Sequence, residues 1–244
     1  MRNLMLKVEY DGTNYHGWQR QDNAVTVQEV LETSLKKITK EKITVTGCSR
    51  TDAGVHALGF VCNFFTGSRI PVDRVPYALN SVLPYDIVVL ECREALQAFH
   101  ARYGAKGKKY RYRVIHRTFP SAFDKNYAYH WPYVLDVEKM KAAAQYFIGE
   151  HDFKAFMATG SSVKSTVRQI FSLTIEQKNS EIIIDVAGNG FLYNMVRIIA
   201  GTLLYAGNGK IAVDEVPVII SAGNRKKAGI TAPPQGLYLV EVYY

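Results

Sequence analysis

Hydrophobic and polar positions in the first part of the chain change repeatedly between a two-residue and a helical period. The two-residue period predicts strands at residues 4–10, 42–49, 59–66 and 86–95. Thr26 and Glu29 form a capping-box pattern before apolar residues at helical spacing, which predicts a helix over 27–38. A shorter helix is predicted over 72–83. This part of the chain therefore has the pattern of one α/β unit.

A comparable order of strands and helices returns in the second part. Strands are predicted at 108–115, 168–177, 180–188 and 236–244, and helices at 137–148, 191–206 and 213–223. The two strands joined around residue 179 are expected to form a hairpin. On the first of these strands Tyr110 and Tyr112 share one face, and the basic residues share the other.

The pattern predicts an α/β (α+β) fold with two halves, each an antiparallel-rich sheet with flanking helices. The stretch from Gly104 to Lys108 is rich in Gly and Lys and is the expected junction. The predicted halves are residues 1–104 and 105–244. No sequence repeat relates them.

The composition is that of a soluble globular protein, with 48% hydrophobic and 21% charged residues. The most apolar stretch, 191–207, contains Asn194 and Arg197, so no membrane span is expected. The N-terminal stretch lacks the apolar core of a signal peptide, and we expect the protein in the cytoplasm. Three widely spaced cysteines (Cys48, Cys62, Cys92) indicate neither a disulfide framework nor a zinc site.

The charge balance indicates an anionic partner. The formal net charge is +8, and seven of the sixteen residues from Arg102 to Arg117 are Lys or Arg, with no acid among them. Charge runs are usually solvated faces, but tyrosines interleave with this one. The stretch "YDGTNYHGWQRQ" (10–21) adds aromatic and basic residues in a loop. Aromatic and basic side chains together are typical of RNA contacts.

Asp52, within "GCSRTDAGVHALG" (47–59), is the first candidate for chemistry. No second acid lies nearby, and G-x-S-x-G is absent, which disfavours glycosidase, metal-dependent nuclease and serine hydrolase chemistry. A single carboxylate acting at an electrophilic carbon fits what remains. Arg50 or Arg197 would keep it ionised. Arg197 lies between apolar helix residues and needs a partner there, although a structural ion pair or a solvent-facing arginine explains it equally well.

Tyr110 is the second candidate. A tyrosine beside a basic face can stack under a nucleobase, and its hydroxyl can move a proton. The chain has 16 tyrosines, so a core or sheet-surface role is the more common alternative.

The chain resembles the tRNA pseudouridine synthase A family, of the TruA type. The resemblance lies in "EYDGTNYHGWQRQ" (9–21), "SRTDAGVHA" (49–57), "FHARYGAKGKKYRYRV" (99–114), "HDFKAF" (151–156), "NGFLYNMVRIIAGTL" (189–203) and "TAPPQGLYL" (231–239). The six stretches occur in matching order across essentially the whole chain.

The resemblance implies a cofactor-free, metal-free isomerase that converts uridine to pseudouridine at positions 38, 39 and 40 of the tRNA anticodon stem-loop. It also implies a homodimer and two ferredoxin-like halves that form one continuous, mainly antiparallel sheet with a basic central cleft. The first half would carry the catalytic Asp, and the second the stacking Tyr and the partner Arg. The reaction would require base flipping.

The resemblance further assigns individual residues. Asp52 matches the catalytic aspartate, Tyr110 the tyrosine that stacks on the target base and accepts a proton, and Arg197 the arginine paired with the aspartate. Leu237 would line the uracil pocket. Arg50 would take the place of the flipped nucleotide, and His56, in the same motif as Asp52, would also bind substrate.

Three routes for Asp52 stay open: attack on C1′ of the ribose, addition to C6 of the uracil, or removal of a sugar proton. Two other functions also stay open. One is a noncatalytic tRNA-binding or RNA-chaperone protein, and the other is a pseudouridine synthase that acts on another RNA.

Overall fold

The computed structural model describes residues 1–160 and 163–244, which form two compact units. Unit 1 consists of Met1–Lys106 together with Tyr238–Tyr244, and unit 2 of Gly107–Leu237. The boundary in the middle of the chain lies two residues after the one that the sequence predicts. The larger difference is the strand near the end of the chain, which we expected in the second half but which pairs within unit 1.

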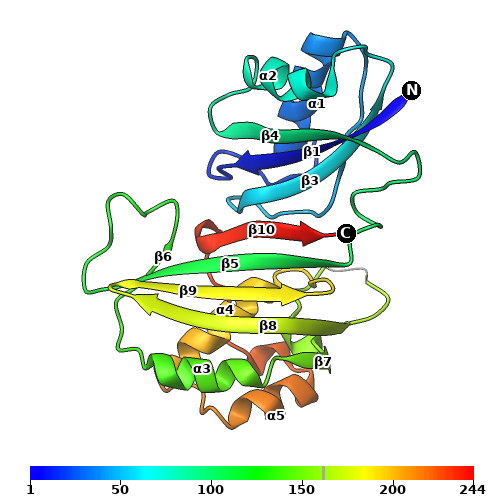
Figure 1. Cartoon of the computed structure of the whole chain (residues 1–244). Helices are drawn as coiled ribbons and strands as arrows, with labels where there is room; N and C mark the ends of the chain where they lie inside the picture. Colours follow the sequence, from blue (N-terminus) through cyan, green and yellow to red (C-terminus); the bar gives the residue numbers. More distant parts are fainter. Residues whose placement is uncertain (161–162) are drawn as a thin grey trace. The chain divides into compact units, whose positions relative to one another are not determined.

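Unit 1 is a four-stranded sheet in the order β4-β1-β3-β10, with short β2 paired to β3 (Figure 1). Its strands are β1 (Arg2–Tyr10), β2 (Thr46–Gly47), β3 (His56–Thr66), β4 (Ile87–Ala95) and β10 (Leu237–Tyr243). Strand β1 is antiparallel to both neighbours, whereas β10 runs parallel to β3. Helices α1 (Val27–Thr39) and α2 (Val75–Asn80) and the 3-10 helix η1 (Val72–Arg74) complete the unit.

The core of unit 1 follows from the predicted periodicities. Leu4, Leu6 and Val8 alternate along β1 and are fully buried, as are Leu31 and Leu35 of α1. The predicted cap is confirmed, because the Thr26 side chain accepts a hydrogen bond from the backbone N–H of Glu29.

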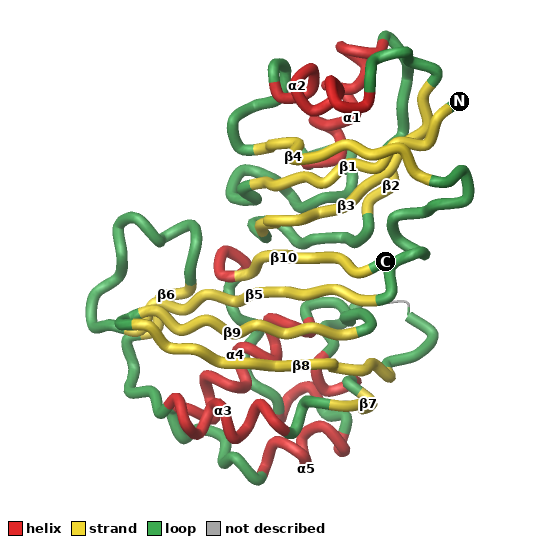
Figure 2. Tube along the Cα trace, in the orientation of Figure 1, coloured by secondary structure: helices red, strands yellow, loops and turns green. Residues whose placement is uncertain are grey.

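Unit 2 contains a sheet in the order β5-β9-β8-β7, antiparallel throughout, and its helices gather on one side (Figures 1 and 2). The strands are β5 (Gly107–His116), β6 (Tyr129–Trp131), β7 (Gly149–Asp152), β8 (Val167–Lys178) and β9 (Glu181–Gly188), and β6 pairs parallel to β5. The helices are α3 (Val137–Gln145), α4 (Met195–Gly207), α5 (Glu215–Ala222) and the 3-10 turns η2 (Lys154–Phe156), η3 (Arg225–Lys227) and η4 (Pro234–Gly236). The predicted α/β class with mainly antiparallel strands and flanking helices is confirmed.

Three predicted elements are shorter than the pattern indicated. The strand expected over 42–49 pairs only at Thr46–Gly47, because that is where the chain reaches β3. The helix expected over 191–206 begins at Met195, since Asn194 takes a left-handed φ of 60°. The helix expected over 72–83 consists of η1 and α2 and ends at Asn80.

Within the described residues, no helix has the length and apolar character needed to cross a membrane. All three cysteines are buried, and none of them forms a disulfide bond.

Two glycine-containing turns of unit 1 pack against each other through their backbones. The Trp18 N–H donates to the Thr51 carbonyl at 3.2 Å, and the Gly54 N–H donates to the Tyr15 carbonyl at 3.2 Å. A Cβ on Gly12 would lie 2.0 Å from the Val55 carbonyl oxygen. The segment 12–18 therefore fixes the position of the turn at 51–55.

Gly17 is required for two reasons. Its φ of +81° lies in the left-handed region, and a Cβ there would lie 2.2 Å from the Thr51 carbonyl oxygen. Any side chain at this position would push the 51–55 turn away.

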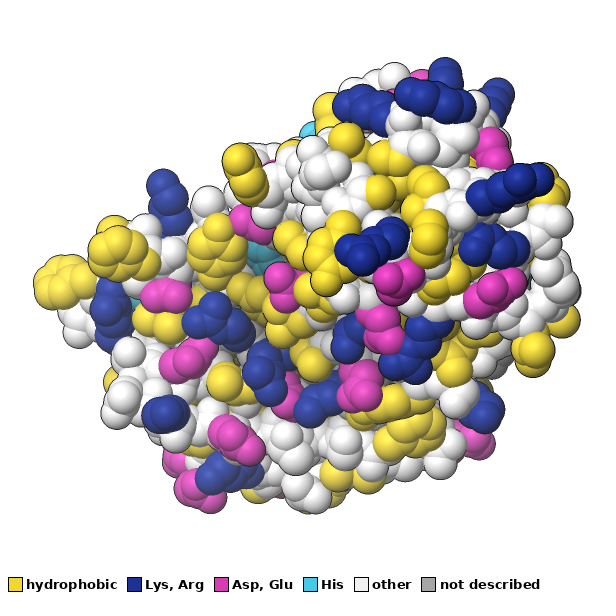
Figure 3. Space-filling view, turned by 45° about the horizontal axis from the view of Figure 1, so that its top comes forward, with side chains coloured by type: hydrophobic (Ala, Val, Ile, Leu, Met, Phe, Trp, Pro, Cys, Tyr) yellow, Lys and Arg dark blue, Asp and Glu magenta, His cyan; other side chains and the backbone are white. Residues whose placement is uncertain are grey.

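The basic face of β5 is neutralised by acids within unit 2. Arg111 donates two hydrogen bonds to Asp185 on β9, and the Lys109 ammonium lies 3.1 Å from the same carboxylate. Arg113 pairs with Glu181 at 2.6 Å and lies 3.5 Å from Asp124. Figure 3 shows dark blue and magenta side chains lying side by side in several places on the face turned to the viewer. The tyrosine face and the basic face are confirmed, but the charges on the basic face have partners.

Asp185 is held in its charged form. Burial raises the pKa of its carboxyl, but the hydrogen bonds from Arg111 and Lys109 outweigh burial, so the pKa lies below its ordinary value. A lowered carboxyl pKa stabilises the folded chain above the unfolded pKa of about 3.9, and this stabilisation is lost as the pH falls through the folded value.

We expect Asp185→Asn to lower the free energy of unfolding by about 1–2 kcal/mol at pH 7, because two cations lose their charged acceptor. The difference from the wild type should begin to shrink as the pH falls below about 4, the unfolded pKa, and should be lost as the pH falls further through the lowered pKa of Asp185 in the folded chain. Thermal and urea unfolding across pH 3–8 measure this difference. Asp214→Asn is the control, since Asp214 is exposed and its side chain makes no capping bond at α5. A pH-independent difference would contradict the assignment.

We expect Gly17→Ala to destabilise the protein more than Gly209→Ala does. Both glycines have a similar positive φ, +81° and +79°, but a Cβ on Gly209 meets nothing within 4 Å. The shared backbone strain costs about 1–2 kcal/mol, and the contact with Thr51 should add about 1–3 kcal/mol at position 17 only. Unfolding of the two variants side by side measures the difference, and equal losses would rule out the packing argument.

Candidate active site

Asp52 is half-buried in the turn that leads from β2 into β3. The turn closes through the Val55 N–H, which donates to the Asp52 carbonyl at 3.2 Å, and Gly54 supplies a φ of +75°. The Thr51 hydroxyl bonds to the hydroxyl of Tyr10 at 2.8 Å. The backbone on both sides of the Asp52 side chain is thereby fixed, as a group that must meet a substrate at one atom requires.

His56 is buried, with 2% of its surface exposed, where the turn enters β3. Its Nδ1 lies 3.0 Å from the Gly12 N–H and 3.1 Å from a carboxylate oxygen of Asp11, and its ring stacks on Tyr238 at 4.7 Å. A single ring nitrogen either accepts from Gly12 or donates to Asp11, so the tautomer decides which bond exists. This environment favours a positioning role over direct contact with a substrate.

Arg50 lies two residues before Asp52 and is exposed. The glycine at position 47 serves packing, since a Cβ there would lie 2.4 Å from the indole nitrogen of Trp18. Trp18 in turn stacks on Phe60 with a centroid distance of 3.9 Å.

Tyr110 lies on β5 of unit 2, opposite Val186 of β9, and 7% of its surface is exposed. Phe191 contacts its ring edge-on at a centroid distance of 5.2 Å. Two residues along the same face, the Tyr112 hydroxyl donates to the Pro233 carbonyl at 2.7 Å. Burial raises the pKa of Tyr112, so this phenol stays protonated and serves as a structural donor.

Arg197 lies in the first turn of α4 and is half-buried. Its Nε donates to the Ala232 carbonyl at 2.7 Å, and Nη1 donates to the Asn194 side chain at 2.8 Å. These bonds use two of the five donors of the guanidinium and fix its plane. The sequence indicates a carboxylate or phosphate partner for this cation, which stays a prediction; two neutral acceptors also hold the guanidinium.

The segment that ends at Leu237 is held by these same side chains. Consecutive carbonyls, of Ala232 and Pro233, accept from Arg197 and Tyr112. Leu237 follows directly and is buried, with 6% of its surface exposed. Sequence reasoning did not identify Asn194 or Pro233 as residues of this region, although both belong to the stretches that carry the family resemblance.

The candidate residues thus fall into two groups. Unit 1 holds Arg50, Asp52 and His56 near one turn, and unit 2 holds Tyr110, Arg197 and Leu237 along β5, α4 and the segment that contains η4. Among the residues that the structure describes, no group of three or more His, Cys, Asp or Glu side chains has the arrangement of a metal site.

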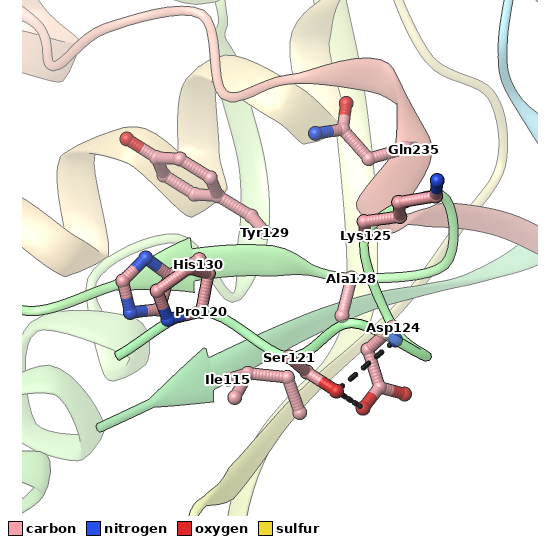
Figure 4. A pocket seen from close by; sticks show the side chains of 9 residues that line it. All are labelled: Ile115, Pro120, Ser121, Asp124, Lys125, Ala128, Tyr129, His130 and Gln235. Carbon is pink, nitrogen blue, oxygen red and sulfur yellow. Dashed lines mark hydrogen bonds between the residues drawn. The ribbon is translucent and has the colours of Figure 1, made fainter. Parts of the chain in front are cut away.

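Unit 2 also contains a mainly apolar cavity of about 240 Å³ beside the loop 120–130 (Figure 4). Asp124 at its rim accepts a hydrogen bond from the Ser121 hydroxyl at 2.6 Å, and it lies near Arg113. The His130 Nε2 bonds to the Arg117 carbonyl at 2.8 Å. The polar groups of Ser121, Asp124 and His130 therefore bond within or next to this loop.

Comparison with known proteins agrees with the motifs around Asp52 and Arg197. The family model described as tRNA pseudouridine synthase matches residues 7–104 and 143–244. These ranges include Arg50, Asp52, His56, Arg197 and Leu237, whereas Tyr110 lies between them.

Three relatives are similar over their whole length. Proteins named tRNA pseudouridine synthase A from Thermoanaerobacter sp. (strain X514) and Acetivibrio thermocellus are 57% and 56% identical over 244 residues, which is 100% of each chain. The protein named tRNA pseudouridine synthase A 2 from Clostridium perfringens is 50% identical over the same length. Among solved structures, a chain of the archaeal box H/ACA sRNP Nop10-Cbf5 complex has a TM-score of 0.39 and 12% identity, covering 97% of this chain and 48% of that one.

The matched family model covers most of the chain, and identity of this level extends from end to end. On this evidence the chain belongs to the tRNA pseudouridine synthase family, whose reaction is the isomerisation of uridine to pseudouridine.

Proposed function

We propose that this protein converts uridine to pseudouridine at positions 38, 39 and 40 of the tRNA anticodon stem-loop, with Asp52 as the catalytic carboxylate. The observation that carries the proposal is the turn at 51–55, in which "RTDAGVH" is held rigidly around a single half-buried carboxylate. The family membership supplies the reaction.

The chemistry is an isomerisation that consumes nothing. The bond between N1 of uracil and C1′ breaks, the base turns, a bond from C5 to C1′ forms, and the hydrogen at C5 is replaced by one at N1. Attack on C1′, addition to C6 and removal of a sugar proton all require an ionised carboxylate. Asp52 is proposed to supply this carboxylate on each route.

Tyr110 is proposed to stack on the target base and to accept the proton from C5. Its ring is held by Phe191 within the sheet, so the ring plane has little freedom. A positioned hydroxyl is a suitable proton acceptor when the reacting carbon lies within hydrogen-bond reach.

The other candidates act around these two. Arg197, fixed by Ala232 and Asn194, is proposed to keep Asp52 ionised, and Leu237 to line the uracil pocket. Arg50 is proposed to occupy the place that the flipped nucleotide leaves. His56 is proposed to hold the turn at 51–55 in position.

Base flipping out of a stem costs a few kcal/mol, and phosphate contacts supply binding energy. Because Lys109, Arg111 and Arg113 are paired with acids, we assign more of this contact to exposed cations such as Lys106. A homodimer and a cytoplasmic location are part of the proposal through the family resemblance. Sedimentation equilibrium of the purified protein tests the dimer, and a monomer at assay concentration would exclude it.

We expect Asp52→Asn to abolish turnover while tRNA binding stays within about threefold of the wild type, because only the reacting group is lost. Tritium release from tRNA labelled at C5 of uridine measures turnover, and filter binding measures affinity. Asp73→Asn, an exposed carboxylate of the same unit, is the control and should turn over normally.

Each other outcome selects a different function. Release by Asp52→Asn would remove Asp52 as the catalyst. Binding without release by the wild type would favour the noncatalytic RNA-binding protein. Pseudouridine mapped in rRNA instead of tRNA from a deletion strain would move the substrate to another RNA.

We expect Tyr110→Phe to keep tRNA affinity but to lower turnover by at least 100-fold, since the ring remains and the hydroxyl is lost. Tyr77→Phe, on an exposed tyrosine of α2, is the matched control and should behave as the wild type. Normal turnover by Tyr110→Phe would show that its hydroxyl moves no proton.

A further inference from the structure

A polar cavity of about 230 Å³ opens on unit 1 beside the residues that precede Asp52. Four segments line it: Trp18 and Gln19, Gln28 of α1, the stretch 45–50, and the stretch 100–103. Ser49 and Arg50 belong to this lining. None of the roles proposed above uses the cavity as a site.

The floor of the cavity is rigid. Trp18 is buried and stacked on Phe60, and Gly47 lies against the indole where no Cβ fits. Such a floor keeps its shape when a ligand arrives, which lowers the ordering cost of binding.

The wall at 100–103 is equally well fixed. The Ala101 N–H donates to the Asn63 side chain at 2.9 Å, and the Tyr244 hydroxyl donates to the Ala101 carbonyl at 2.7 Å. The Nδ1 atom of His100 accepts from the N–H groups of Arg102 and Tyr103 at 3.1 and 3.2 Å. The neutral imidazole of His100 therefore carries its proton on Nε2.

This wall presents an aromatic ring and a cation to solvent. Tyr103 is 78% exposed, its ring lies 4.3 Å from that of His100, and the Arg102 guanidinium lies 5.8 Å from its centroid. An exposed ring beside a guanidinium suits a base that stacks and a phosphate that pairs.

The charge of the cavity points to an anion. No acidic residue lines it, and neither Arg50 nor Arg102 forms a salt bridge within the described part of the chain. Lys109, Arg111 and Arg113 differ in this respect, because each has an acid partner. The volume lies below the roughly 300–1,000 Å³ of cavities for drug-sized ligands, which suits a single nucleobase.

Building on the proposed function, we propose that this cavity binds one nucleotide of the substrate RNA other than the uridine that reacts. Tyr103 stacks on its base, and Arg102 contacts its phosphate. Arg50 is two residues from Asp52, so their Cα atoms are at most about 7 Å apart. The bound nucleotide therefore lies close in space to the target uridine.

We expect Tyr103→Ala to raise KM for an anticodon stem-loop RNA about 5- to 150-fold with kcat nearly unchanged, because a stacking contact is lost. Tyr103→Phe should stay within about twofold of the wild type, since the ring remains. Tritium release at varied RNA concentration gives both constants.

The chain offers a matched control for this pair. Arg74 and Tyr77 have the same arrangement, with the guanidinium 5.9 Å from the ring centroid and Tyr77 72% exposed, but neither lines the cavity. Tyr77→Ala should leave KM unchanged. Equal effects of Tyr77→Ala and Tyr103→Ala would overturn the proposal.

A scan with abasic nucleotides locates the contact. Stem-loop RNAs that each lack one base near the target are bound to the wild type and to Tyr103→Ala, with affinity measured by filter binding. We expect one position to weaken wild-type binding by the factor seen for Tyr103→Ala, and to have no further effect in that variant. If every abasic position weakens both proteins equally, the proposal fails.

Uridine 5′-monophosphate tests whether the cavity binds a free nucleotide instead of a nucleotide within the RNA. A mononucleotide that binds the wild type through Tyr103 and competes with stem-loop RNA supports the proposal, whereas binding without competition assigns the cavity to a free nucleotide and overturns it. These binding measurements need no turnover. If the protein makes no pseudouridine, the proposed function is wrong. The abasic scan still shows whether the cavity binds a nucleotide of the RNA.

Discussion

The close backbone contact between segments 12–18 and 51–55 is the constraint on which unit 1 depends. Gly12 and Gly17 have no room for a side chain, because the carbonyls of Val55 and Thr51 occupy that space. Buried backbone groups at this contact must bond to each other, since water is excluded. The two motifs that stand out in the sequence, about forty residues apart, therefore pack together as one structural unit. The backbone that carries Asp52 is therefore positioned by the segment 12–18.

In unit 2, side chains rather than backbone contacts fix an irregular segment. The segment 231–236 contains two prolines, which lack the N–H groups needed for regular pairing. Side-chain donors from β5 and α4 satisfy the carbonyls of Pro233 and Ala232, and the Ala232 N–H donates back to the Arg197 carbonyl at 3.1 Å. An irregular segment gains in this way a defined conformation next to Leu237. Arg197 and Tyr112 thus have a structural role that is independent of any catalytic role.

The sequence predicted the elements well where local signals are strong. The capping box at Thr26, the hairpin around Asn179 and the two faces of β5 all depend on neighbouring residues and are confirmed. Features that depend on residues far apart in the sequence could not be predicted from it. The pairing of Arg111 with Asp185 depends on strand register, so three cations of a run that looked available for RNA, Lys109, Arg111 and Arg113, are paired with acids. Candidate residues were found through motifs, and their burial, as for His56, required the fold.

The discontinuity of unit 1 bears on how the chain is made. Strand β10, which completes the unit 1 sheet beside β3, and Tyr244, which fastens the 100–103 wall, are both synthesised after all of unit 2. Because domains generally fold as they leave the ribosome, unit 2 can fold first as a continuous segment, whereas unit 1 must wait with one sheet edge open. The residues around Asp52 reach their final setting only after β10 has been synthesised. A nascent chain thus exposes no finished cavity to RNA while its second unit is still being built.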